Sequence, residues 1–140
     1  MILAMSDHDI TGLVGQMFAF LNADESWSQM LRDADVRLLR FADVGLDTDA
    51  ADEDVRSICV QEDIVLITGN RNQESETSLN ATLRRELDAT AVPVLTIADV
   101  QRFSRDSTYR EDASITALQY LTEIDRHRGA GRLRLPDSPA

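Results

Sequence analysis

Short apolar runs that lack helical spacing alternate in this chain with longer segments whose apolar residues recur every three or four positions. The runs at residues 1–5 and 64–67 each end at polar residues, which is the pattern of buried strands. Between them, apolar residues from Ile10 to Leu21 follow the spacing of a single helix face. A chain that alternates in this way is restricted to few folds, because the helices must cover the apolar faces of the strands.

The same patterns predict the remaining elements. Ser26 and Gln29 resemble a capping box and predict a short helix through Leu31, and the acids at 52–54 predict the start of a helix with Val55 facing inward. The other expected elements are an apolar stretch at 36–41, a helix marked by Leu79, Leu83 and Leu87, a strand at 92–97, and a final helix marked by Ala117, Leu118, Leu121 and Ile124.

Strands that alternate with helices predict an α/β fold. We expect a small parallel sheet of about four strands, joined by right-handed crossovers and covered by helices on both faces in a three-layer Rossmann-type arrangement. The length of 140 residues suits one domain and is too short for two. We assign residues 1–135 to a single domain and 136–140 to a flexible tail, and we expect the whole segment from Arg132 onward to be peripheral.

The charge balance is strongly acidic, with 25 Asp and Glu against 14 basic residues, all of them Arg, and a net charge of −11. The excess lies in residues 1–100, which hold seven Arg against nineteen acids, whereas residues 101–140 hold seven Arg against six acids. Binding of nucleic acid by bulk electrostatics is therefore excluded, because that mode needs a basic surface. A divalent cation, or RNA bound through a local basic patch, is compatible with this balance.

Cysteine usage and apolar run length exclude further classes. Cys59 is the single cysteine, which rules out an intramolecular disulfide and a multi-cysteine metal site. The apolar runs are too short to span a membrane, and no charged and then apolar leader opens the chain. We therefore expect a cytoplasmic protein with no membrane partner.

Polar residues follow each predicted strand or open the helix after it. In an open parallel sheet, ligands bind beyond the carboxyl ends of the strands, so a site is expected there. Carboxylate oxygens suit Mg²⁺ or Mn²⁺, and amide and guanidinium groups suit a phosphate or a water. Acids also collect at helix starts because the helix dipole favours them, and this simpler explanation stays open. The residues concerned are Asp7, Asp9, Asp52, Glu53, Thr68, Asn70, Arg71, Asn72 and Asp99.

The first half of the chain resembles the compact PIN-like domains. Residues 2–72 carry the resemblance through the order of their pieces: a strand that ends in acid, a long amphipathic helix, Val44-Gly45-Leu46, Asp52-Glu53-Asp54, and a strand that ends at Thr68. PIN-like domains are metal-dependent nucleases that bind Mg²⁺ or Mn²⁺ through carboxylates, and many are toxin ribonucleases of bacterial toxin–antitoxin pairs. The resemblance implies that Asp7, Asp9, Asp52 and Glu53 hold the metal and that Asp7, Asp52 and Glu53 are catalytic.

The chain departs from that family after the third strand. Where such proteins usually carry two aspartates, this chain has Asn70 and Asn72, whose amide oxygens can coordinate a cation but bring no charge. Metal affinity is expected to fall accordingly, unless Glu74, Glu76 or Asp99 replaces the missing acids.

Two functions are therefore open. The first is a metal-dependent ribonuclease, a hydrolase that acts as one component of a toxin–antitoxin pair, with phosphate or water positioned by Thr68, Asn70, Arg71, Asn72 and Asp99. The alternative is a non-catalytic PIN-like module that binds protein or nucleic acid. Either form has reason to bind a cognate protein partner or to form a homodimer, because a small sheet gains from covering its edges.

A cationic cluster near the carboxyl end has two interpretations. Arg126, Arg128, Arg132 and Arg134, with His127 among them, form the densest basic segment of the chain. The cluster would give RNA phosphates a landing site. Alternatively, it docks against the acidic body of the protein near a helix carboxyl end.

Overall fold

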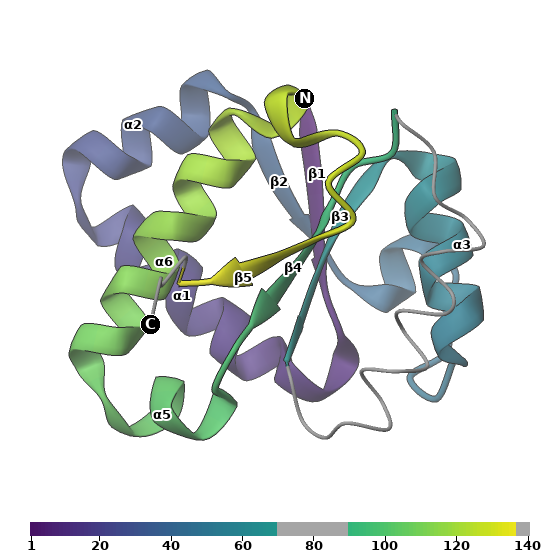
Figure 1. The fold of residues 1–140 in the computed structure, drawn as a ribbon, viewed down its shortest axis with the longest axis horizontal. Helices are drawn as coiled ribbons and strands as arrows, with labels where there is room; N and C mark the ends of the chain where they lie inside the picture. The colour runs from purple at the N-terminus through teal and green to yellow at the C-terminus, as the bar shows by residue number, and fades with distance from the viewer. Residues whose placement is uncertain (70–89, 137–140) are drawn as a thin grey trace.

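The computed structural model describes residues 1–69 and 90–136, which form five strands and the helices that cover them (Figure 1). Among these residues, no helix is long and apolar enough to cross a membrane. The elements are β1 (Ile2–Ser6), η1 (His8–Ile10), α1 (Thr11–Ala23), α2 (Glu25–Asp33), β2 (Val36–Leu39), η2 (Phe41–Val44), α3 (Asp52–Glu62), β3 (Ile64–Gly69), β4 (Val94–Ile97), α5 (Val100–Arg105), α6 (Ser107–Thr122), η3 (Ile124–His127) and β5 (Arg132–Leu135).

The sheet is entirely parallel, with the strand order β2-β1-β3-β4-β5. The predicted α/β class is confirmed, but the sheet has five strands rather than four. The additional strand, β5, lies in the segment that the sequence predicted to be peripheral, and it pairs with β4 from Val94↔Arg132 to Ile97↔Leu135. Its Leu residues alternate with Arg residues, which suits a strand with one buried face.

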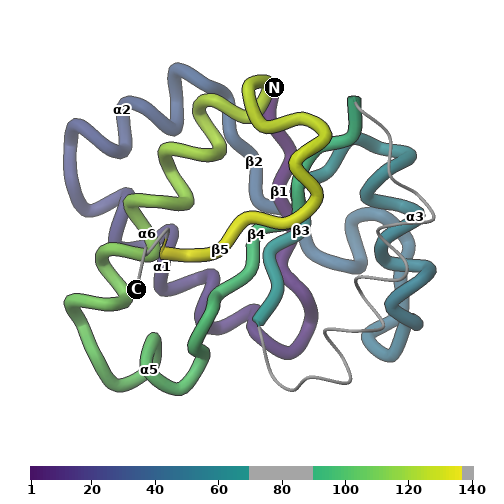
Figure 2. The backbone as a smooth tube through the Cα atoms, viewed as in Figure 1, coloured from purple at the N-terminus to yellow at the C-terminus, as the bar shows by residue number. Residues whose placement is uncertain are grey.

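Helices cover both faces of the sheet, as the sequence predicted (Figure 2). Among the described residues, the first face carries the larger core, in which Ala4 and Ile67 from the sheet meet Val14 of α1 and Ala117 and Leu121 of α6. We call it the α1/α6 face. The second, the α3 face, carries a smaller core built from Met5, Leu66 and Val94 of the sheet with Val55 and Cys59 of α3.

The crossover from β4 to β5 contradicts the prediction that all crossovers are right-handed. Helices α1 and α6 pack together on one face of the sheet, while β2 and β5 lie at opposite edges, so the β1–β2 and β4–β5 connections must have opposite hands. In Figure 1 β5 lies at the front and β2 at the back, which makes β1–β2 right-handed and β4–β5 left-handed. Ala113 and Ala117 of α6 are buried in the same core as Val14 of α1, and their small side chains let α6 pack closely on this face.

Gly69 allows the carboxyl end of β3 to pass between η1 and α5. A Cβ atom at this position would lie 2.6 Å from Cγ2 of Val100 and 3.3 Å from Cγ2 of Ile10. The first distance is too short for any side chain, so the close packing at this end of the sheet requires glycine.

Several element boundaries also differ from the prediction, including those of two helices. Helix α2 begins at Glu25 rather than at a Ser26 cap, because the Asp24 carboxylate accepts a hydrogen bond from the Trp27 N–H. The predicted final helix is preceded by a further helix, α5, and begins earlier than its apolar markers indicated, at Ser107. The helix predicted from Leu79, Leu83 and Leu87 lies outside the described residues.

Candidate functional site

The strand register brings Asp7, Thr68, Thr96 and Arg134 into one row across the carboxyl end of the sheet. Ser6 pairs with Ile67, and the Asp7 N–H donates to the Ile67 carbonyl at 2.8 Å, which places Asp7 beside Thr68. Thr68 pairs with Thr96, and Thr96 pairs with Arg134. We call these four residues the polar row.

Strand alternation places the polar row on the α3 face. The next residues toward the amino end on the same face, Met5, Leu66 and Val94, belong to the apolar cluster beneath α3. Thr68 and Thr96 are 5% and 3% exposed, and their hydroxyl oxygens lie 3.3 Å apart in a hydrogen bond. The two hydroxyls therefore form a buried, hydrogen-bonded polar pair next to the apolar cluster beneath α3.

The first turn of α3 lies at the same end of the sheet as Asp7. Helix α3 runs antiparallel to β3, to which Asp63 connects it directly, so its N-terminal Asp52 and Glu53 lie toward the carboxyl ends of the strands, on the α3 face. Both side chains are exposed, as is Asp9 in η1, whereas Asp7 is half-buried. The structure thus brings Asp7 and the α3 acids to one rim of the sheet.

These acids do not form a complete metal site by themselves. Within residues 1–69 and 90–136, no group of three or more His, Cys, Asp or Glu side chains is close enough together to hold a metal ion. Asn70, Arg71 and Asn72, together with Glu74 and Glu76, lie outside the described residues. Asp7, Asp52 and Glu53 would therefore need additional ligands to bind Mg²⁺ or Mn²⁺.

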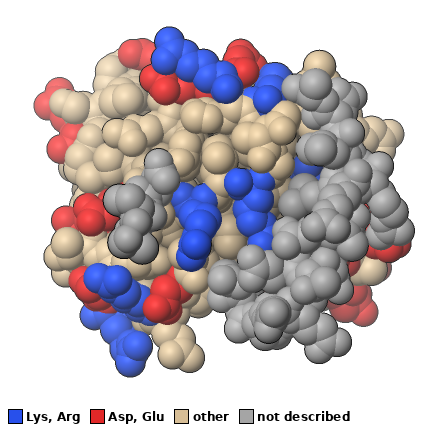
Figure 3. Space-filling view, in the orientation of Figure 1, with Lys and Arg blue, Asp and Glu red and all other residues tan. Residues whose placement is uncertain are grey.

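Arginines on the α3 face add positive charge to this region. Arg56 of α3 is 2% exposed and is the largest fully buried side chain of the described residues. Arg132 and Arg134 project from β5 on the same face, since Leu133 and Leu135 pack into the opposite core. Figure 3 shows basic side chains gathered near the centre of the molecule, where Figure 1 places β5. A buried guanidinium is costly without a compensating anion, so the interior of the α3 face favours negative groups near Arg56.

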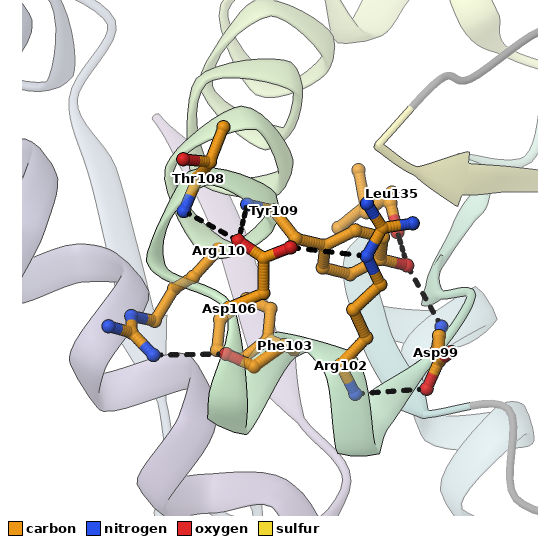
Figure 4. Close-up of polar contacts among 8 residues, drawn as sticks. All are labelled: Asp99, Arg102, Phe103, Asp106, Thr108, Tyr109, Arg110 and Leu135. Atoms are coloured by element: carbon orange, nitrogen blue, oxygen red, sulfur yellow. Dashed lines mark hydrogen bonds and ion pairs between the residues drawn. The ribbon is translucent and has the colours of Figure 1, made fainter.

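Asp99, which the sequence placed with the site, instead lies on the α1/α6 side of the rim (Figure 4). Its carboxylate accepts the Arg102 N–H at 3.0 Å and caps α5, while its own N–H donates to the Tyr109 hydroxyl at 3.0 Å. That hydroxyl in turn donates to the Leu135 carbonyl at 3.4 Å. Burial raises the pKa of Tyr109 above its ordinary value, which keeps the hydroxyl protonated as a donor.

The neighbouring residues tie α5, α6 and β5 together on that side. The Asp106 carboxylate accepts the N–H groups of Thr108 and Tyr109, and the bond from Tyr109 is the main reason that the pKa of Asp106 lies below its ordinary value. Arg102 stacks over the Tyr109 ring at 4.8 Å and pairs with Asp106 at 3.3 Å (Figure 4). These contacts make the α1/α6 side of the rim a structural junction.

The cationic cluster at the carboxyl end of the sequence divides between the two ends of the sheet. The Arg128 guanidinium donates to both oxygens of Asp63 at 2.9 Å and to Asp125 at 2.8 Å, and it holds the pKa of Asp63 below its ordinary value. Arg126 pairs with Glu123 at 3.6 Å. The docking interpretation is therefore confirmed for Arg128, whereas Arg134 lies in the polar row at the opposite end of the strands.

Thr96 and Arg56 were not assigned to a site by the sequence, and Arg134 was considered only as part of the cationic cluster. The sequence could have indicated Thr96, because Thr68 and Thr96 are the polar residues of two otherwise apolar strands. Arg56 carried no such signal, since nothing in the spacing of α3 shows that an arginine is buried. The His8 ring lies 6.1 Å from that of Phe41, which belongs to the core of the α3 face.

Comparison with known proteins adds no assignment: no family model, no curated protein and no solved structure matches the chain. The candidate site is therefore defined by the chain's own geometry.

Proposed function

We propose that this chain is a metal-dependent ribonuclease of the PIN-like type, whose RNA lies on the α3 face at the carboxyl end of the sheet. The observation that supports the proposal is the polar row, in which a carboxylate and a guanidinium lie at either side of two buried hydroxyls. Arg134 provides hydrogen-bond donors for phosphate oxygens beside the buried Thr pair, and Asp7 provides a hard anionic ligand for a cation. An acidic protein needs such a local site, because its net charge of −11 repels RNA elsewhere.

In this proposal the anionic ligands would come from among Asp7, Asp9, Asp52 and Glu53, and Asn70 and Asn72 would add neutral oxygen ligands. A bound Mg²⁺ or Mn²⁺ would provide an activated water and neutralise charge on the phosphate. Thr68, Thr96 and Arg134 then orient the phosphate, and Arg71 is a further candidate for that role. A cognate protein partner, as in a toxin–antitoxin pair, is part of the same proposal.

The test compares RNA cleavage by the wild type, by Asp7→Asn, and by Asp125→Asn with Mn²⁺ or Mg²⁺ present. Asp125 is an exposed carboxylate at the other end of the sheet, so its variant controls for loss of one surface charge. We expect Asp7→Asn to lower the cleavage rate by about 100-fold, which is the upper end of the loss seen when a residue that supports a metal ligand is changed. Asp125→Asn should leave the cleavage rate unchanged. Equal cleavage by the wild type and Asp7→Asn would remove Asp7 from the mechanism.

The second candidate function, a module that binds RNA or protein without cleavage, is favoured by one observation. Across the described part of the chain, no three metal-ligating side chains come together. The two functions differ in thermal unfolding with metal, because a cation that binds only the folded state must raise the melting temperature. A rise with millimolar Mn²⁺ that is smaller in Asp7→Asn supports the nuclease. No rise, together with RNA binding that Arg134→Gln weakens, supports the binding module.

A further inference from the structure

One edge of the sheet presents open backbone groups. Strand β2 is the outermost described strand on that side. The Ile2 N–H donates to the Asp35 carbonyl at 2.9 Å, so the alternation of a parallel ladder directs the N–H and C=O groups of Val36 and Leu38 away from β1. Such an edge is a template for a further strand.

Apolar side chains surround this open edge. Leu38 is 40% exposed, and it is one of three exposed large hydrophobic residues in the described ranges. Beside Leu38 lies a hollow of about 470 Å³, lined by Phe18, Leu31, Val36 and Leu38 with Asn22, Arg32 and Asp35. We call β2 and this hollow the β2 edge surface.

The charge of the β2 edge surface identifies its occupant. Arg32, Arg37 and Asp35 lie on this surface, and the residues next to it in the chain, Asp33, Arg40 and Asp43, bring the local charge to zero, although the whole chain carries −11. Two copies of an acidic protein repel each other across most of their surfaces, and a locally neutral surface with both signs lets them approach.

We propose that a second copy of this chain docks on the β2 edge surface, with the two β2 strands antiparallel about a two-fold axis at Leu38. An axis perpendicular to the sheet keeps each helix layer on its own side, and it requires paired residues to share a face. Centring the axis on Leu38 packs the two exposed leucines together, whereas centring it on Arg37 would oppose two like charges.

The backbone fits this register. Each Leu38 donates to and accepts from the other copy's Leu38, and the Val36 N–H faces the other copy's Arg40 carbonyl. The Arg40 N–H needs no partner across the interface, because it already donates to Asp43 at 2.7 Å. Each Arg40 side chain then lies across from the Asp35 end of the other strand, where the charges are opposite.

The first experiment is sedimentation velocity of the full chain from micromolar to near-millimolar concentration. We expect a concentration-dependent dimer that Leu38→Glu abolishes and Ala130→Glu leaves intact. Ala130 is exposed in the turn before β5, so its variant adds the same charge far from β2. A wild type that stays monomeric throughout would overturn the proposal, as would a dimer that persists in Leu38→Glu.

A second variant tests the register and does not depend on how Leu38→Glu folds. The Cα atoms of a directly hydrogen-bonded antiparallel pair lie about 5.5 Å apart, within the range of a disulfide. With an added thiol oxidant, Leu38→Cys should form a covalent dimer rapidly, and Arg37→Cys should form little. The native Cys59 is fully buried and contributes no background. Failure of Leu38→Cys to cross-link, or equal cross-linking by Arg37→Cys, would overturn the proposed pairing.

Discussion

The two faces of the sheet differ in the polar contacts that they make at the carboxyl ends of the strands. On the α1/α6 face, the Tyr109 hydroxyl links the Asp99 N–H to the Leu135 carbonyl. The carboxylates of Asp99 and Asp106 accept backbone N–H groups in the first turns of α5 and α6. On the α3 face, the same level of the sheet holds two hydroxyls that bond to each other between Asp7 and Arg134.

The α1/α6 side of the rim therefore holds elements of the fold together, and the α3 side is suited to a ligand. A cluster whose donors and acceptors are used by neighbouring backbone groups holds elements together. A row that crosses four strands, rests on apolar residues and carries both charges is built more like a binding surface. The α1/α6 face should therefore control stability and the α3 face should control ligand binding.

The largest expected effect comes from matched core substitutions on the two faces. Leu95 faces the α1/α6 core and Leu66 faces the α3 core, and both are buried in neighbouring central strands. Truncation to Ala should lower the free energy of unfolding by about 2–5 kcal/mol in either case, with the larger loss for Leu95→Ala because more of the described buried residues belong to the core that it faces. Denaturant unfolding measures the free energy of unfolding of both variants. A larger loss for Leu66→Ala would contradict the expectation that the α1/α6 face contributes more to stability.

Gly69→Ala should have the next largest effect. A Cβ atom 2.6 Å from Cγ2 of Val100 forces the Val100 side chain or the backbone around it to shift, at a cost of about 1–3 kcal/mol. The control is Gly15→Ala in α1, where nothing lies within 4 Å of the new Cβ atom and the helix should gain about 0.5–1 kcal/mol. The melting temperatures of the two variants should shift in opposite directions from that of the wild type. A Gly69→Ala variant with an unchanged melting temperature would show that this end of the sheet is loosely packed.

Tyr109→Phe probes the junction on the α1/α6 face. Loss of the hydroxyl removes the acceptor for the Asp99 N–H and should cost about 1–2 kcal/mol. Because the pKa of Tyr109 is raised in the folded state, its contribution is complete below the ordinary value of 10.0 and is lost as the pH rises from there through the folded pKa. The wild type should therefore lose stability above pH 10 more steeply than the variant. Parallel curves would contradict burial as the cause of the shift.

Asp63→Asn should have the smallest effect. Asp63 holds Arg128 at the amino end of the sheet, and its side chain is 58% exposed, so solvent limits the loss to a few tenths of a kcal/mol at neutral pH. Because the pKa of Asp63 is lowered, the contribution is present above the ordinary value of 3.8 and is lost as the pH falls through the folded pKa. Asn tolerates the left-handed backbone at this position, where φ is 57°. The two proteins should converge in acid, and a constant difference in unfolding free energy down to pH 2 would exclude the ion pair.

The sequence predicted the elements whose signals are local. The run at 64–67 is uniformly apolar and bounded by polar residues, and β3 is found there; the acids at 52–54 begin α3 as expected. Strand β5 was missed because it has only four residues, two of them Arg, and it is stabilised by pairing with β4, which is remote in sequence. The left-handed crossover was missed because it depends on which face α6 joins, and that is decided by its packing against α1.

The candidate site was predicted only in part for the same reason. Asp7 and the α3 acids follow from the rule that sites lie beyond the carboxyl ends of parallel strands. Thr96 and Arg134 join them through the register of β3, β4 and β5, which no local pattern specifies. Asp99 follows the same rule as Asp7, yet a helix begins directly after it and uses its carboxylate as a cap.

The assignment of ligand binding to the α3 face is tested most directly by titrating the ¹⁵N-labelled chain with a short single-stranded RNA in the presence of Mg²⁺. The amide chemical shifts are the measurement. We expect the largest changes at Asp7, Thr68, Thr96 and Arg134, with Asp99 and Tyr109 little affected. Changes confined to the Asp99 and Tyr109 junction, or no changes at any RNA concentration, would contradict the assignment of ligand binding to the α3 face.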